Sequence, residues 1–337
     1  MNYITKNFDN DLIDCSITSN YDEEYINIYP TLKEQELLYL ACKYPRNPGC
    51  CDVKSKIIKK FSLPNVLLGN GSEDLIVRLN QIFSQHNYKI GVVYPIFYRI
   101  IETISNDIYY IQEPEIFNCD LRGYDVIWLQ NPNLFSGNTH DRDRLKKLIK
   151  NNTATLFVVD EAGMLTLIEW EKYSLMTYCK EIDNLIILST FSKIYGMSGL
   201  RAGFATGNAK VLKMIEKYSL TFPLSAVTEF FLDNILGKEN EVGYFRKKIS
   251  SNKDNLEKLM ERDRDVFLKH NLTNCIFAYH KSKNLSEELL RRGIITLELD
   301  RVLGVEEKRY VRIAVHSSNR TYNLLRDAIF EVLSLKD

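Results

Sequence analysis

Short apolar runs alternate with amphipathic stretches through the middle of the chain, and this pattern predicts alternating strands and helices. The apolar runs lack polar alternation, which is typical of strands that are covered on both faces. These strands are predicted at Asn65–Leu68, Lys89–Val93, Val126–Leu129, Thr155–Val159, Asn184–Leu188 and Arg201–Thr206. Helices are predicted between them at Ser72–Phe83, Asp141–Asn151 and Lys210–Tyr218. Alternation of this kind indicates an α/β architecture.

The pattern changes after about residue 223, where long helices precede a shorter mixture of strands and helices. The predicted elements are the helices Val227–Leu236 and Asn240–Arg262, the strand Asn274–His280, the helix Leu285–Arg292, the strand Tyr310–Val315 and the helix Asn319–Leu335. Tyr25–Phe61 is expected to be mostly helical and irregular. Because 337 residues exceed the usual single core, we expect an N-terminal arm with part of a small domain (residues 1–45), a large domain (46–222), and connecting helices with a C-terminal small α+β domain (223–337).

Composition excludes several classes of protein. The chain carries 44 basic and 44 acidic side chains, so its formal net charge is zero, whereas nucleic-acid binders need a basic excess. No stretch approaches the roughly 20 apolar residues of a membrane span, and residues 1–11 lack an apolar signal core. The seven cysteines are irregularly spaced, and the histidines show no metal-binding spacing. We therefore expect a cytoplasmic protein without a metal, a nucleic-acid partner or a membrane partner.

The strongest chemical signal is a lysine that follows an apolar strand. Lys193 lies in the run STFSKIYGMSGLR (residues 189–201), in which Arg201 comes eight residues later. Such a lysine would face the crevice at the carboxyl ends of parallel strands, where α/β proteins bind ligands. We interpret Lys193 as a Schiff-base lysine, with the hydroxyls of Thr190 and Ser192 and the guanidinium of Arg201 available to a phosphate. A surface lysine beside an arginine would be the simpler interpretation of a shorter pattern.

The same run resembles that of the fold-type I pyridoxal-phosphate (PLP) enzymes, and within them the histidinol-phosphate aminotransferase group. In that group a Ser-Lys pair and a Gly-x-x-Gly-Leu-Arg run carry the PLP lysine and a phosphate-binding arginine, as at Lys193 and Arg201. The resemblance extends from about residue 14 to residue 335. It implies PLP as the cofactor and the aspartate-aminotransferase fold, in which a three-layer α/β/α large domain with a mainly parallel sheet is joined to a smaller α+β domain.

Two more strand ends match motifs of this family. Residues 68–74 (LGNGSED) are similar to the family's Gly-Asn-Gly-Ser-Asp-Glu turn with the two acids reversed. The resemblance implies that backbone N–H groups of Gly71, Ser72 and Glu73 hold the PLP phosphate at a helix N-terminus; a purely structural turn is the alternative. Asp160, in the run DEAG (160–163), matches the family's Asp-Glu-Ala-Tyr motif and is expected to pair with the pyridine nitrogen. Glu161 is expected to be a structural acid.

Four further residues take roles from the resemblance. Phe97 follows Pro95 by two residues and would stack on the PLP ring, with core packing as the alternative. Arg312 would bind the substrate carboxylate, with a structural ion pair as the alternative. The segment that ends at Asn20 is expected to lie over the substrate. Tyr29, in an Asn-Ile-Tyr-Pro segment similar to the family's Asn-Arg-Tyr-Pro, would reach the PLP phosphate of a partner subunit. That role requires a homodimer.

One loop departs from the family. Residues 130–138 (QNPNLFSGN) are similar to the family's Asn-Pro-Asn-Asn-Pro-Thr-Gly loop, but Leu134 replaces the asparagine that donates to the phenolic oxygen of PLP. The tyrosine that donates to the same oxygen is replaced by Gly163. We expect Asn133 to contact the cofactor. We also expect Asn133, Asn131 or a substrate group to fill the room beside Gly163, and the Lys193 Schiff base to stay protonated to a higher pH than usual.

Three functions follow from these residues. The first is an aminotransferase that moves an amino group between a small, phosphorylated amine or amino acid and a 2-oxo acid, with Lys193 as general base and acid. The second is a PLP decarboxylase like the threonine-phosphate decarboxylases, in which the tyrosine of the Asp-Glu-Ala-Tyr motif also varies. The third is a non-catalytic PLP-binding domain of the kind found in transcription regulators, although this chain shows no N-terminal DNA-binding module.

Overall fold

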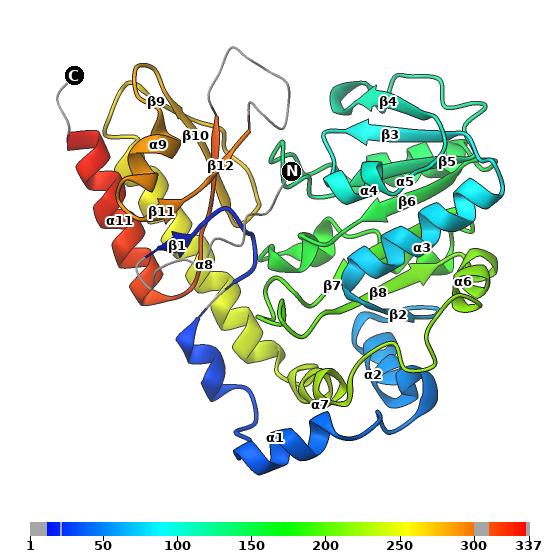
Figure 1. Cartoon of the computed structure of the whole chain (residues 1–337). Coiled ribbons are helices and arrows are strands. Elements are labelled where there is room, and N and C mark those ends of the chain that lie inside the picture. The colour runs from blue at the N-terminus through cyan, green and yellow to red at the C-terminus, as the bar shows by residue number, and fades with distance from the viewer. Residues whose placement is uncertain (1–11, 21, 300–309, 335–337) are drawn as a thin grey trace.

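A seven-stranded sheet with the order β2-β8-β7-β6-β5-β3-β4 forms the centre of the large domain (Figure 1). The computed structural model describes residues 12–20, 22–299 and 310–334. The strands are β2 (Leu67–Asn70), β3 (Ile90–Tyr94), β4 (Ile108–Gln112), β5 (Val126–Gln130), β6 (Leu156–Asp160), β7 (Leu185–Thr190) and β8 (Ala202–Gly207). Only β8 is antiparallel to its two neighbours. The other six strands therefore end at one edge of the sheet, where β8 begins.

Helices cover both faces of this sheet. Consecutive residues of β5, such as Ile127 and Trp128, belong to two separate hydrophobic clusters, and both side chains are fully buried. One cluster contains side chains of α3 (Gly71–Gln85) and α6 (Ala209–Glu216), and the other contains side chains of α2 (Cys51–Phe61) and α5 (Arg142–Asn151). This arrangement is the three-layer α/β/α architecture that the sequence predicts, and it explains why the strands lack polar alternation.

The helices begin where the sequence supplies a capping side chain. Asp141 accepts a hydrogen bond from the N–H of Arg144 at 2.7 Å and starts α5. Asn208 accepts one from the N–H of Val211 at 2.9 Å and starts α6. These side chains replace the partners that the first N–H groups of a helix lack.

The C-terminal part forms a second, antiparallel sheet of order β12-β13-β10-β9. Its strands are β9 (Val266–Leu268), β10 (Cys275–His280), β12 (Leu297–Glu298) and β13 (Val311–Ala314). The helices of this part are α7 (Ala226–Ile235), α8 (Glu239–Met260), α9 (Leu285–Leu290) and α11 (Asn319–Ser334). Figure 1 shows α8 leading from α7 toward this sheet, and it shows α9 and α11 on the side of the sheet that is away from the seven-stranded sheet.

The N-terminal segment joins the two parts of the fold. Its strand β1 (Ile13–Asp14) pairs in parallel with β11 (Ile294–Ile295), so these two residues lie on the C-terminal part. It then continues through η1 (Glu23–Asn27), α1 (Glu34–Ala41) and η2 (Pro48–Cys50) to α2 of the large domain. The division into an N-terminal arm, a large domain and a C-terminal small domain, with bounds at residues 45 and 222, stays a prediction. The remaining short elements are α4 (Tyr98–Glu102), η3 (Glu113–Glu115), η4 (Met164–Thr166), η5 (Trp170–Lys172) and η6 (Met176–Lys180).

Each strand and helix predicted from residue 65 onward is present, with bounds that shift by a few residues. The strand β4 was not predicted. It lies at the sheet edge and pairs only with β3, and its Tyr109 and Tyr110 are exposed, so no buried apolar run marks it. Within the described residues, no helix is both long enough and apolar enough to span a membrane.

Candidate active site

The strand register brings the predicted site residues to one edge of the sheet. Thr190 at the end of β7 lies opposite Gly203 of β8, and Asn70 at the end of β2 lies opposite Ala202. Asp160 at the end of β6 lies opposite Leu188 of the same β7. The lysine loop follows β7 and the Gly-Ser turn follows β2, so the same edge of the sheet carries Lys193, Asp160, Gly71, Ser72 and Arg201.

The turn between β2 and α3 forms an anion cradle with Arg201. The φ angle of Gly71 is +75°, and a Cβ at this position would lie 2.7 Å from Nη2 of Arg201. A Cβ on Gly203 would lie 2.4 Å from the backbone nitrogen of Ser72. Both positions therefore require glycine, and the guanidinium covers the first turn of α3, whose N–H groups lack partners within the helix.

Two details refine this part of the prediction. The N–H of Gly71 donates to the carbonyl oxygen of Arg201 at 3.1 Å, so the open N–H groups of the turn are those of Ser72 and Glu73. Arg201 has a φ of +52°, a left-handed conformation that is uncommon outside glycine and is often found at functional sites. Its Nη1 donates to the carbonyl oxygen of Ser198 at 3.1 Å. The backbone of Arg201 is thus strained while its side chain is held over the cradle.

The two hydroxyls predicted for the phosphate, those of Thr190 and Ser192, lie where β7 ends and the lysine loop begins. The Thr190 hydroxyl is 3.0 Å from the carbonyl oxygen of Ala202 and 2.9 Å from the Ser192 hydroxyl, and it accepts the N–H of Ser192 at 3.1 Å. Thr190 therefore fixes the conformation of the turn. Ser192 is the better placed of the two for an anion, because it does not also close on a carbonyl oxygen.

Lys193 is set up as a nucleophile. Burial lowers its pKa to about 8, and the positive charges of Arg312 and Arg201 act in the same direction, while Asp160 opposes them. A minor fraction of this amine is therefore neutral near neutral pH, but a far larger one than in an ordinary lysine, and the neutral form is the one that attacks a carbonyl carbon.

The N-terminal segment holds the lysine loop by its backbone. Three consecutive carbonyl oxygens, those of residues 193–195, accept hydrogen bonds from the N–H of Asn20 at 3.2 Å, from the Tyr25 hydroxyl and from the Tyr29 hydroxyl. The φ of Gly196 is +66°, and a Cβ at this position would lie 2.9 Å from the Tyr25 ring. Tyr25 therefore packs closely against the loop that carries the lysine.

Asn20 links this loop to the C-terminal part of the fold. Its Nδ2 donates to the Tyr25 hydroxyl at 2.9 Å and to the Ser317 hydroxyl at 2.8 Å, and its Oδ1 accepts the N–H of Ser317 at 2.9 Å. The structure thus places Asn20 beside Lys193 but gives its side chain a bridging role within the protein. A direct contact with substrate stays a prediction.

Tyr29 also has partners within its own chain. Its hydroxyl donates to the carbonyl oxygen of Tyr195, and burial raises its pKa above the ordinary value.

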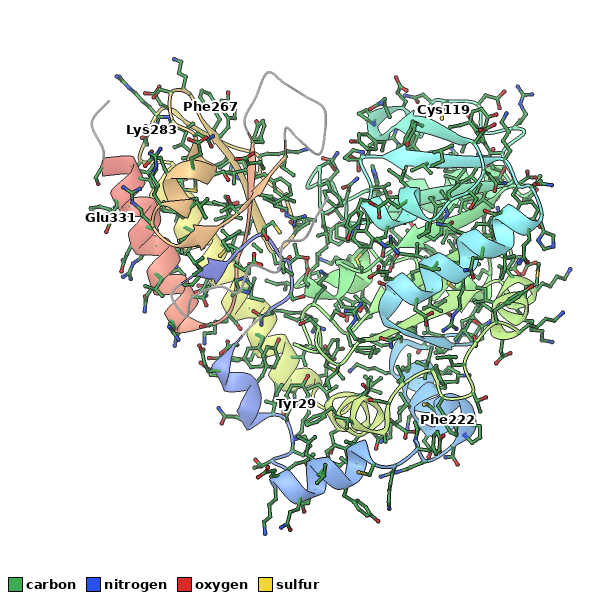
Figure 2. All side chains as sticks on the ribbon, viewed as in Figure 1. Tyr29, Cys119, Phe222, Phe267, Lys283 and Glu331 are labelled. Carbon is green, nitrogen blue, oxygen red and sulfur yellow. The ribbon has the colours of Figure 1, made fainter. Side chains whose placement is uncertain are left out.

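The sequence analysis overlooked another Tyr-Pro pair, Tyr44-Pro45, which a lysine precedes. Tyr44 is 80% exposed, and its ring stacks on Phe222 with centroids 4.9 Å apart. Figure 2 shows Tyr29 near α7 and α8 and Phe222 beside α2. Tyr44 is therefore the better candidate for contact with a partner subunit.

Asp160 is buried in a polar setting. Its Oδ1 accepts the N–H of Ala162 at 3.0 Å and its Oδ2 accepts from Nε2 of Gln130 at 3.2 Å. Burial raises its pKa to about 6, and these hydrogen bonds and Lys193 act in the opposite direction. Glu161 accepts the Ser174 hydroxyl at 2.6 Å and the N–H of Leu175 at 2.7 Å, as expected of a structural acid.

Leu134 fills the room beside Gly163. A Cβ at Gly163 would lie 2.9 Å from Cδ2 and 3.2 Å from Cγ of Leu134. A neighbouring side chain therefore occupies this space, although it is neither of the two asparagines named as examples. Asn133 donates to the carbonyl oxygen of Pro95 at 2.7 Å, and Asn131 accepts the N–H of His140 at 2.9 Å. Contact of a substrate group at this place stays a prediction.

Arg312 lies on β13 of the C-terminal sheet, close enough to Lys193 for its charge to lower the pKa of that lysine. It is 5% exposed, and its Nη1 and Nη2 donate to the carbonyl oxygens of Leu134 at 2.7 Å and Ser16 at 2.6 Å. Phe97 caps α4, packs partly against the core and meets Tyr98 edge to face with centroids 4.9 Å apart. Contacts of Arg312 with a carboxylate, and of Phe97 and Asn133 with a cofactor, stay predictions.

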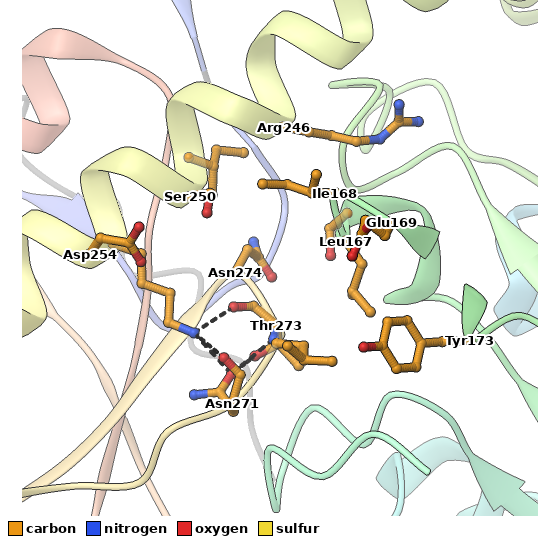
Figure 3. Close-up of a pocket in the computed structure, with 14 residues that line it drawn as sticks. Leu167, Ile168, Glu169, Tyr173, Arg246, Ser250, Asp254, Asn271, Thr273 and Asn274 are labelled. Atoms are coloured by element: carbon orange, nitrogen blue, oxygen red, sulfur yellow. Dashed lines mark hydrogen bonds between the residues drawn. The ribbon is translucent and has the colours of Figure 1, made fainter. Parts of the chain in front are cut away.

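Other possible ligand sites are poorer in chemistry. A cavity of about 320 Å³ lies between residues 166–173, α8 and residues 271–274, and none of the predicted site residues lines it. Lys253 lines this cavity, and its ammonium group donates to the carbonyl oxygens of Asn271 and Thr273, both of which are labelled in Figure 3. No group of three or more potential metal ligands occurs in the part of the chain that the structure describes.

Comparison with known proteins agrees with this geometry. The profile of the family "Aminotransferase class I and II" matches residues 23–329. This chain belongs to that family. The histidinol-phosphate aminotransferase of Buchnera aphidicola subsp. Cinara cedri (strain Cc) is 27% identical over 297 residues, which cover 80% of this chain and 82% of that protein.

Solved structures of the same fold superpose on nearly the whole chain. The L-threonine-O-3-phosphate decarboxylase from Porphyromonas gingivalis has a TM-score of 0.81 at 19% identity and covers 96% of this chain and 100% of its own. The histidinol-phosphate aminotransferase from Sinorhizobium meliloti, solved in complex with pyridoxal-5'-phosphate, has a TM-score of 0.79 at 16% identity and covers 95% of this chain and 90% of its own. The chain thus has the aspartate-aminotransferase-like fold of PLP-dependent enzymes.

The residues at the sheet edge fit PLP, the cofactor of this family. The cradle of Gly71, Ser72 and Arg201 suits a phosphate, Lys193 is a partly neutral amine, and Asp160 is a buried carboxyl group that can face a ring nitrogen. The edge formed by Leu134 and Gly163 is apolar. This site therefore differs from the family pattern at the phenolic oxygen.

Proposed function

We propose that this member of the class I and II aminotransferases moves an amino group between a small, phosphorylated amine or amino acid and a 2-oxo acid. The observation that carries the proposal is the convergence of a partly neutral lysine, a buried carboxyl group and an anion cradle at one sheet edge. PLP supplies the electron-withdrawing ring that makes the amino-bearing carbon acidic. Lys193 would hold the cofactor and would then take up and return the proton of that carbon, while Asp160 would keep the ring nitrogen protonated.

The remaining site residues would bind and orient the cofactor and the substrate. The N–H groups of Ser72 and Glu73, the Ser192 hydroxyl and Arg201 would hold the phosphate, and Phe97 would lie against the ring. Arg312 would take the substrate carboxylate with its planar fork. In the free protein this fork bonds to two carbonyl oxygens, those of Leu134 and Ser16. A carboxylate would exchange these neutral acceptors for a charged one. The phosphorylated substrate is proposed because relatives such as that of Buchnera aphidicola are named histidinol-phosphate aminotransferases.

A decarboxylase is the second candidate. It is favoured by the absence of the tyrosine at Gly163 and by the structural similarity to a threonine-phosphate decarboxylase, with a TM-score of 0.81. The two reactions differ in the bond that breaks at the same carbon. The outcome would depend on whether Arg312 holds the substrate carboxylate during the reaction.

We also propose a homodimer, in which each subunit would contribute a residue to the phosphate site of its partner. The helix α1 has no buried residue, and its Leu37, Leu38 and Tyr39 are 43%, 63% and 60% exposed. Apolar groups in this number favour burial against another subunit. Tyr44, three residues beyond α1, would then reach the partner's phosphate site. A cytoplasmic location remains a prediction from the sequence.

The test is turnover by the purified holoenzyme with histidinol phosphate, phosphothreonine and phosphoserine, each with and without 2-oxoglutarate. Glutamate formed in equal amount to the amine consumed supports the aminotransferase. Release of CO₂ without need of 2-oxoglutarate supports the decarboxylase. If PLP binds and none of these compounds reacts, the proposed substrate class is wrong.

A further inference from the structure

A chain of four alternating charges lies beside the phosphate cradle. Nε of Arg99 donates to Oε1 of Glu73 at 2.8 Å, and Nη1 of Arg99 donates to Glu102 at 2.9 Å. The other oxygen of Glu73, Oε2, is 4.0 Å from Nη2 of Arg201. This is the same Nη2 that lies over Gly71. Glu73 thus stands between two arginines and is bonded to the one that is farther from the cradle.

The carboxylate of Glu73 is a competitor of a phosphate at this place. It lies in the first turn of α3, where an acid interacts favourably with the helix N-terminus. A phosphate dianion would use the same N–H groups and the same guanidinium. Oε2 of Glu73 lies at the limit of an ion pair with Arg201, at 4.0 Å, so an unrestrained Glu73 side chain needs only a small movement to reach hydrogen-bonding distance. Its negative charge would also repel the phosphate.

We propose that Arg99 is a positioning residue for the cofactor phosphate, because it holds the Glu73 carboxylate away from Arg201 and neutralises its charge. The inference rests on the proposed role of Gly71, Ser72 and Arg201 in phosphate binding. The helix α4 lies against α3, and it carries Arg99 two residues after Phe97. One short helix therefore supplies both a ring contact and the group that keeps the phosphate cradle open.

Because these side chains are partly exposed, an effect of Arg99 on phosphate binding can be distinguished from an effect on folding stability. The side chains of Arg99, Glu73 and Arg201 are 31%, 41% and 43% exposed. Ion pairs with such exposure add little to folding stability. Removal of Arg99 should therefore leave the fold intact and should alter mainly the binding of an anion at the cradle.

The test compares PLP with pyridoxal, which lacks the phosphate. Affinities of the cofactor-free protein for both compounds are measured by the visible absorbance of the bound forms in the wild type, Arg99→Met, Glu73→Gln, the double variant and Glu102→Gln. Arg99→Met should weaken PLP binding by about fivefold at low salt, the upper range for a partly exposed charge pair, and by less at 1 M salt. Pyridoxal binding should change by less than about twofold.

The double variant decides the mechanism. Glu73→Gln removes the competing charge, so it should restore PLP affinity in the Arg99→Met background to within about twofold of the wild type. Glu102→Gln, which changes the other partner of Arg99, should leave PLP affinity unchanged. The proposal is overturned if Arg99→Met binds PLP normally, if it loses PLP and pyridoxal equally, or if Glu73→Gln restores nothing. Failure of the wild type to bind either compound would instead overturn the cofactor site itself.

Discussion

The packing of Leu134 against Gly163 makes a quantitative prediction about two variants and their combination. Gly163 has helical backbone angles, with φ −86° and ψ −13°, so an alanine meets no backbone strain there. Its Cβ would nevertheless lie 2.9, 3.2 and 3.3 Å from three carbon atoms of Leu134. Gly163→Ala should therefore overpack this buried edge and destabilise the protein by about 1–3 kcal/mol.

Leu134→Ala acts in the opposite sense on the same space. Leu134 is 6% exposed, so its truncation leaves a cavity and should cost about 2–5 kcal/mol. The methyl group of Gly163→Ala fits into that cavity. The double variant should therefore be more stable than the sum of the single effects predicts, with a coupling of about 1–3 kcal/mol.

The assay is urea denaturation of the cofactor-free protein, with the four proteins compared by their midpoints at equal slope. Gly199→Ala is a matched control, because a Cβ at Gly199 would have no neighbour within 4 Å, and it should not couple to Leu134→Ala. Additive effects at positions 134 and 163 would refute the reasoning, since they would mean that the two side chains do not share one space.

Three further predictions address the chemistry of the site. The Schiff base of Lys193 with PLP should stay protonated above neutral pH, as followed by its visible absorbance band, because Leu134 and Gly163 offer no donor to the phenolic oxygen. In the double variant Leu134→Asn/Gly163→Tyr the Schiff base should titrate at lower pH. A wild-type midpoint well below neutrality would contradict this prediction. Burial raises the pKa of Asp160 from about 3.8 to about 6, so its contribution to stability is full below about pH 4 and is lost as the pH rises through 6. In the cofactor-free protein, Asp160→Asn should therefore lower the stability difference between pH 4.5 and pH 7.5 by about 2 kcal/mol, measured by urea midpoints, and an unchanged difference would show that Asp160 does not titrate in this way. Tyr25→Phe removes the donor to the carbonyl oxygen of Ile194 and should cost about 1–3 kcal/mol, whereas Tyr244→Phe, at a side chain that is 51% exposed, should cost little; equal effects would argue against a role for Tyr25 in holding the loop.

Strand ends were the part of this site that the sequence could predict. Lys193, Asp160 and Gly71 each follow an apolar run, and parallel strands place such ends at one edge. The strands β6 and β7 therefore brought Asp160 and the lysine loop together as expected. The strand β4 escaped prediction because an exposed edge strand has no buried run to mark it.

Side-chain directions within loops could not be predicted. The pattern at residues 130–138 suggested that an asparagine would turn toward Gly163, but the hydrogen bond from Asn133 to Pro95 directs its amide elsewhere, and Leu134 turns inward. Similarly, the pairing of Arg99 with Glu73 joins residues 26 positions apart. Contacts of this kind depend on how segments far apart in the sequence meet, and no local pattern predicts them.

Tyr29 and Tyr44 illustrate the limits of a short motif. Both precede a proline, and the motif alone does not distinguish them. Their surroundings do: the Tyr29 hydroxyl bonds to the carbonyl of Tyr195 in the same chain, whereas Tyr44 is 80% exposed. The lysine directly before Tyr44, at the place of the arginine in the family motif, is the sequence feature that favours Tyr44 for the proposed contact with a partner subunit.

The identity of the residue that holds PLP is the most direct test of the proposed site. The purified protein would be loaded with PLP, reduced with borohydride, digested and analysed by mass spectrometry. We predict one pyridoxyl group per chain, attached to Lys193, and no such group in Lys193→Ala treated in the same way. Attachment at another lysine, or the absence of any attached group in the wild type, would contradict the assignment of this sheet edge as the active site.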